Sequence, residues 1–75
     1  MRFVIQVKLT DALRDWEMDG LRRMGLSVAE NGLSVTGLGE DFDALRKYDF
    51  WKTVGFGANV DKMMAQVDAG DYVWL

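Results

Sequence analysis

The chain has 75 residues and a net charge of −3. It contains no cysteine and no histidine, which excludes disulfides, thiolate metal sites and nucleophilic triads built on His or Cys. The acidic balance disfavours direct binding to nucleic acid or to an anionic membrane, because such binding depends on Lys and Arg, and no apolar run approaches the ~20 residues that span a bilayer. We therefore expect one soluble, cytoplasmic domain, residues 1–75, without a metal or cofactor.

The first two expected elements are a strand and a helix. Residues 2–9 alternate, which is typical of a half-buried strand, and its inward face is Phe3, Ile5, Val7 and Leu9. A helix is predicted over residues 11–24, because Thr10 or Asp11 can cap its start and Gly25 can end it. The inward face of this helix is expected to carry Leu13, Trp16, Gly20, Leu21 and Met24.

A β-hairpin is predicted over residues 26–37. Asn31 and Gly32 suit the two central positions of a type I′ turn, where φ is positive. With that turn, the facing pairs are Val28 with Val35 and Ser27 with Thr36, and the apolar face is Leu26, Val28, Leu33 and Val35. The other face is small and polar, which predicts a sheet that is covered on one side only.

Two helices and a strand are expected in the second half. Residues 40–52 begin with acids and continue with cations, the order that a helix dipole favours. Asn59 is a suitable N-cap for a second helix that ends at Gly70, and residues 71–75 predict a short strand. The expected inward residues are Phe42 and Leu45 in the first helix and Val60, Met63, Met64 and Val67 in the second. Residues 50–58 fit either a loop or an extra strand.

This succession of elements predicts an α+β fold of the ferredoxin-like order β-α-β-β-α-β, with a four-stranded antiparallel sheet and the helices on one face. The first strand would then be central, beside the third and the fourth. A two-layer α+β domain with another strand order is the alternative. Acylphosphatases share the predicted order, but residues 9–11 lack the Gly and Arg of their phosphate loop. RNA-recognition domains also share it, but the open face has no aromatic residue among Arg2, Val4, Gln6, Lys8, Ser34 and Thr36.

No catalytic site is expected, and the acidic residues are instead candidates for a surface that imitates nucleic acid. Asp11, Asp15 and Asp19 recur every four residues, so they would line one side of the first helix at ~6 Å per step. The full candidate set is Asp11, Asp15, Asp19, Glu40, Asp41 and Asp43. The alternative is an ordinary solvated helix face, on which such acids pair with nearby arginines.

Aromatic residues in the C-terminal half form a second candidate surface, because they exceed what a small sheet can cover. The candidates for protein contacts are Trp51, Phe56, Tyr72 and Trp74. Residues 71–75, as an edge strand, could also accept an added strand. The alternative is that residues 53–58 fold over these side chains and bury them.

We expect a non-enzymatic protein-interaction module, a small acidic inhibitor of a larger protein with a basic, nucleic-acid-binding surface. Small acidic chains without His or Cys are common among phage-encoded inhibitors of bacterial defence, the anti-CRISPR type included, and this analogy rests on size and charge alone. One alternative is an ACT-like domain that senses a small ligand, with Gly37, Gly39 and residues 55–59 lining its site. Another is a structural subunit that self-associates, for example as a homodimer, at residues 72–75.

Overall fold

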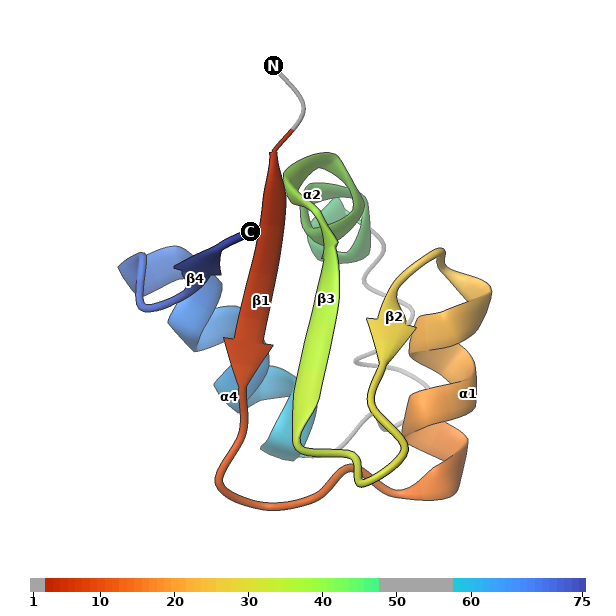
Figure 1. Ribbon diagram of the computed structural model, residues 1–75. Helices are drawn as coiled ribbons and strands as arrows, with labels where there is room; N and C mark the ends of the chain where they lie inside the picture. The colour runs from red at the N-terminus through yellow and green to blue at the C-terminus, as the bar shows by residue number, and fades with distance from the viewer. Residues whose placement is uncertain (1–2, 48–57) are drawn as a thin grey trace.

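The computed structural model describes residues 3–47 and 58–75 of the chain (Figure 1). Its elements are β1 (Val4–Lys8), α1 (Asp15–Arg23), β2 (Ser27–Val28), β3 (Ser34–Leu38), α2 (Gly39–Lys47), α4 (Ala58–Ala69) and β4 (Val73–Trp74). In the described part of the chain, four strands form one antiparallel sheet in the order β2-β3-β1-β4. With the three helices of the described residues, this open sheet places the protein in the α+β class.

Strand β1 lies at the centre of the sheet, between β3 and β4. It pairs with β3 from Val4 opposite Leu38 to Lys8 opposite Ser34, and with β4 at Ile5 and Gln6. The predicted alternation is confirmed, since Ile5 is buried whereas Gln6 is only half-buried. The expectation that the first strand is central is confirmed as well.

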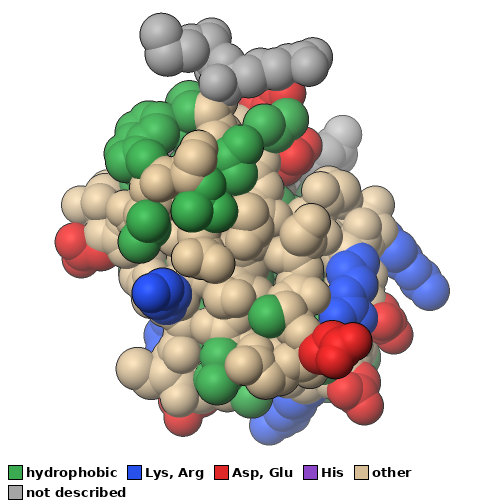
Figure 2. Space-filling model, viewed as in Figure 1, with side chains coloured by type: hydrophobic (Ala, Val, Ile, Leu, Met, Phe, Trp, Pro, Cys, Tyr) green, Lys and Arg blue, Asp and Glu red, His purple; other side chains and the backbone are tan. Residues whose placement is uncertain are grey.

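The sheet has one covered face and one open face. In Figure 1, α2 and α4 lie behind the sheet and α1 lies beside β2. The core between sheet and helices contains side chains with no exposed area, among them Val7, Leu21, Val35, Phe42, Leu45, Val60 and Met63. The opposite face, on the side of Gln6 and Thr36, is turned to the viewer in Figure 2, and no helix of residues 3–47 and 58–75 lies over it. The predicted one-sided sheet is therefore confirmed.

Helix α1 begins at Asp15, four residues later than predicted, so Thr10 and Asp11 do not cap it. The backbone N–H of Leu13 donates instead to the carbonyl of Gly32, at 2.9 Å, which holds the chain in a loop before the helix. The helix start is stabilised by Glu17, whose Oε1 accepts a hydrogen bond from the backbone N–H of Arg14 at 3.0 Å.

The inward face of α1 also differs from the prediction. Trp16 is 44% exposed, whereas the carboxylate side chain of Glu17 is buried together with Met18 and Leu21. The predicted inward face was counted from Leu13 at spacings of three and four residues. Because Leu13 lies outside the helix, this count wrongly placed Trp16 on the inward face. In α1, spacings of three and four connect Leu21 with Met18 and Glu17.

The hairpin has its predicted register but a different turn. The pairs Val28 with Val35 and Ser27 with Thr36 are confirmed. The predicted type I′ turn is wrong, because such a turn needs a positive φ at both Asn31 and Gly32. Gly32 has φ of 70°, but Asn31 does not have a positive φ, since among the described residues only glycines do. The N–H of Gly32 donates to the carbonyl of Ala29 at 2.9 Å, and Asn31 Oδ1 accepts from the N–H of Leu33 at 3.0 Å. Leu33 lies at this turn and is 38% exposed, so it is not part of the buried face.

The C-terminal helices largely follow their predicted patterns. The helix expected over residues 40–52 is present as far as Lys47, and its remainder lies outside the described residues. Helix α4 ends before Gly70, which has φ of 77°. Asn59 lies inside α4, which spans Ala58–Ala69. Its side-chain Nδ2 donates to the carbonyl of Ala12 at 3.1 Å.

Candidate functional site

Apolar side chains are exposed along β4, at one edge of the sheet. Val73, Trp74 and Leu75 are 46%, 58% and 67% exposed. Figure 2 shows hydrophobic side chains gathered in the upper part of this view, near β4 and the adjoining ends of β1 and β3. We call Phe3, Val4, Leu38 and residues 72–75 the β4 surface. Soluble proteins rarely leave such neighbouring apolar residues exposed unless they bind something.

The β4 surface extends over both faces of the sheet edge. Val73 is opposite Gln6 and so points to the open face, whereas Trp74 is opposite Ile5 and points to the covered face. The rings of Trp74 and Phe3 have centroids 4.6 Å apart, and those of Trp74 and Tyr72 are 5.6 Å apart. Three aromatic rings therefore form a cluster at the end of the sheet.

A hollow of about 230 Å³ lies beside this cluster. It is lined by Phe3, Ile5, Gly39, Asp43, Val67, Asp68 and Tyr72. The residues come from β1 and the residue before it, from the first half of α2, from the end of α4 and from the residue before β4. Both charged lining residues are acids, and the lining includes two aromatic rings. Carboxylates and the faces of aromatic rings both attract organic cations such as ammonium and guanidinium groups.

The backbone of β4 offers hydrogen-bonding groups on its outer side. The N–H of Leu75 donates to the carbonyl of Val4 at 3.1 Å. In an antiparallel pair, residues bonded to the neighbouring strand alternate with residues whose N–H and C=O point away from it. Trp74, which stands between Val73 and Leu75, therefore directs both backbone groups outward, where a further strand can pair with them.

The other edge of the sheet is protected. Helix α1 packs beside β2 (Figure 1), and Nη2 of Arg22 donates to the carbonyl of Val28 at 3.2 Å. Charged side chains over an edge strand are a common means of preventing strand addition. The two sheet edges are thus unequal, and no strand in the described part of the chain pairs with the outer side of β4.

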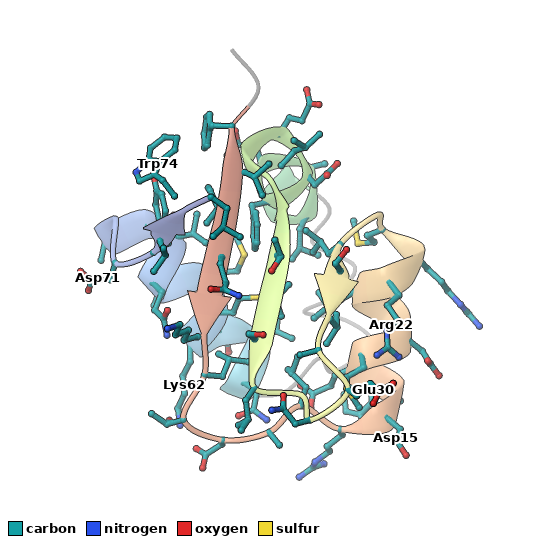
Figure 3. The ribbon with its side chains drawn as sticks, in the orientation of Figure 1. Asp15, Arg22, Glu30, Lys62, Asp71 and Trp74 are labelled. Atoms are coloured by element: carbon teal, nitrogen blue, oxygen red, sulfur yellow. The ribbon has the colours of Figure 1, made fainter. Side chains whose placement is uncertain are left out.

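The six predicted acidic residues come from three parts of the fold. Asp11 lies in the loop before α1, not on the helix, and its carboxylate pairs with Lys62 Nζ at 3.1 Å. On α1, Asp19 lies 3.9 Å from Arg22, and Asp15 is exposed at the lower end of the view in Figure 3. Glu40, Asp41 and Asp43 lie at the start of α2, at the opposite end of the sheet (Figure 1). The expected row of three acids along one helix is therefore wrong.

Two of the four predicted aromatic residues, Tyr72 and Trp74, belong to the β4 surface. Trp51 and Phe56 lie outside the described residues. Sequence reasoning missed Phe3, which it assigned to the core, and it left the orientation of Val73 and Leu75 open. The strand register supplies that orientation, because it places Trp74 and Ile5 on one face.

Two of the glycines proposed for a small-ligand site, Gly37 and Gly39, are accounted for by packing, whereas residues 55–57 lie outside the described residues. A Cβ atom at Gly37 would lie 2.4 Å from Leu26 Cδ2, and one at Gly39 would lie 2.2 Å from the ring of Phe3. Side chains of the protein itself therefore occupy the space beside both glycines. In residues 3–47 and 58–75, no group of three or more acids could hold a metal ion, and no helix is long and apolar enough to cross a membrane.

Comparisons of the chain with protein-family models, with curated proteins and with solved structures gave no match.

Proposed function

We propose that this protein is a non-enzymatic interaction module that binds another protein through the β4 surface. The observation that carries the proposal is the run of three exposed apolar residues formed by the edge strand β4 and the residue after it, namely Val73, Trp74 and Leu75. Tryptophan is among the residues that contribute most to binding at protein interfaces. Here Trp74 is held by Phe3 and Tyr72, which lowers the entropy that the side chain would lose on binding.

We infer that the partner presents a basic surface, of the kind found on nucleic-acid-binding proteins. The net charge of −3 supports this inference, as do the acids of the hollow and the exposed Asp71 beside β4. Long-range attraction between opposite charges speeds association and selects among partners. By extension, we propose that the protein inhibits such a partner, as proteins of the anti-CRISPR type do. This extension rests on the small size and acidity of the chain.

Within the α+β class, we infer that the fold is ferredoxin-like. It is supported by the β-α-β-β-α-β succession of the elements and by a first strand placed between the third and the fourth. This arrangement hosts many unrelated functions, so the functional proposal rests on the β4 surface alone.

The test is a selection from a displayed random peptide library on the immobilised full chain, followed by affinity measurements with the enriched peptides. Trp74→Ala is expected to weaken their binding at least tenfold, as is typical of an interface anchor. Trp16→Ala is the matched control, because Trp16 is also an exposed tryptophan but lies on α1.

Three results of this selection would overturn the proposal. One is a failure to enrich any binding peptide. Another is equal weakening of binding by Trp16→Ala and Trp74→Ala. The third is full binding by Trp74→Ala combined with loss of binding when Asp15 and Asp19 are changed to Lys, which would favour the acidic helix surface instead.

A further inference from the structure

We propose that β4 binds its partner by strand addition, and that the added segment is an extended stretch of another protein in which Lys or Arg alternates with apolar residues. This inference rests on the proposed function and names the mode of binding and the chemistry of the partner. Three features carry it: the outward backbone groups of β4, the apolar side chains on the open face, and the negative charge near the edge.

The backbone groups set the register of the added strand. Trp74 directs its N–H and C=O away from β1, whereas Leu75 uses its own N–H to bind the carbonyl of Val4. One residue of the partner can therefore exchange two hydrogen bonds with Trp74. The sheet β2-β3-β1-β4 would gain a fifth strand at its β4 edge.

The side chains on each face set the composition of the added strand. The residue opposite Trp74 would point to the covered face, beside the Trp74 and Tyr72 rings, where a guanidinium or ammonium group gains from contact with aromatic faces. Its two neighbours would point to the open face beside Val73 and Leu75, which are 46% and 67% exposed. β-Branched apolar residues fit there best, because they pack well on a pleated surface.

The negative charge near β4 favours a basic segment of another protein, over a second copy of this chain, as the strand that adds to this edge. Asp71 is exposed and projects on the same side of the molecule as Trp74 (Figure 3), and the nearby hollow has acids as its only charged lining residues in the described part of the chain. Two copies joined at β4 would bring two chains with a net charge of −3 each together. Like charges at an interface oppose association.

The experiment is an NMR titration of the full chain with a synthetic peptide, acetyl-Lys-Val-Arg-Val-Lys-amide. Binding is expected to shift the amide signals of residues 72–75 and of β1, and Trp74→Ala is expected to weaken it. A peptide that is N-methylated at its central Arg lacks the N–H that faces the Trp74 carbonyl. We expect it to bind about tenfold less tightly, since it leaves a carbonyl unpaired.

A pair of variants tests the same contact from the side of the protein. Trp74→Pro removes the outward N–H as well as the indole, whereas Trp74→Ala removes the indole alone. Proline is tolerated on an edge strand where its nitrogen faces outward, and a contact between Val73 and Gln6 in the NMR spectra would show that β4 stays in place. Trp74→Pro is expected to bind more weakly than Trp74→Ala.

The outcomes separate the two proposals. If the N-methylated peptide binds as well as its parent, or Trp74→Pro binds as well as Trp74→Ala, strand addition is wrong but binding at the β4 surface stands. Equal binding of a peptide with Glu in place of Lys and Arg overturns the basic partner. Slower tumbling of the protein at high concentration without peptide would identify a second copy as the occupant. If the parent peptide shifts no signal of β4 at millimolar concentration, the inference is overturned.

Discussion

Replacement of Gly32 by alanine should destabilise the protein more than replacement of any solvent-facing glycine. Gly32 has φ of 70°, and an added Cβ would lie 2.9 Å from the backbone nitrogen of Leu13 and 3.0 Å from its carbonyl oxygen. A left-handed conformation costs a residue with a side chain about 1–2 kcal/mol. Loss of the hydrogen bond between Leu13 N–H and the Gly32 carbonyl costs about 1 kcal/mol more. We therefore expect a loss of about 3 kcal/mol with the steric contact included.

The matched control is Gly70→Ala, because Gly70 has φ of 77° but has no atom within 4 Å of the added Cβ. Its cost is the backbone term alone, about 1–2 kcal/mol. In thermal unfolding followed by circular dichroism, a domain of this size loses about 4–8 °C in Tm per kcal/mol. Gly32→Ala should thus lower Tm by roughly 12–24 °C and Gly70→Ala by roughly 4–16 °C. Equal shifts in Tm would refute the account of the contact between the turn and Leu13.

Three other substitutions probe separate interactions in urea unfolding experiments. Phe42→Ala, at a side chain with no exposed area, should cost about 3–5 kcal/mol; a loss under half of that would contradict its central place in the core. Glu17→Ala should cost about 1 kcal/mol by removing the acceptor for Arg14 N–H, and Glu17→Gln, which keeps an acceptor, should cost less. Lys62→Ala breaks an exposed pair with Asp11, so it should change the free energy of unfolding by under about 1 kcal/mol, and added salt should shrink that change.

Much of the architecture follows from short-range patterns in the sequence. The alternation around Ile5 predicts a half-buried strand, and the spacing of Val60, Met63 and Met64 predicts the inward face of α4. The hairpin register could be predicted because a shift by one residue would move Val28 and Val35 to opposite faces. These features depend on residues that are close in the sequence, through the two-residue period of a strand and the 3.6-residue period of a helix.

The errors arose where distant parts of the chain meet. The start of α1 was placed too early because the bond from Leu13 to Gly32 connects a loop with a turn 19 residues away. Asn59 resembles an N-cap residue in the sequence, but its amide binds Ala12 instead. For the proposed binding surface, composition indicated the surplus of aromatic residues, and the strand register was needed to show to which face each side chain of β4 points.

The central position of β1 has a consequence for the order in which the protein can be completed during synthesis. One neighbour of β1, β4, is translated after every other described element, and the side chain of Gln66 in α4 donates to the carbonyl of Lys8. A nascent chain that ends before residue 66 therefore leaves one side of β1 without its native partners. Since these contacts join residues that are far apart in the sequence, the pairing of β1 with β4 should form only after β4 has been translated.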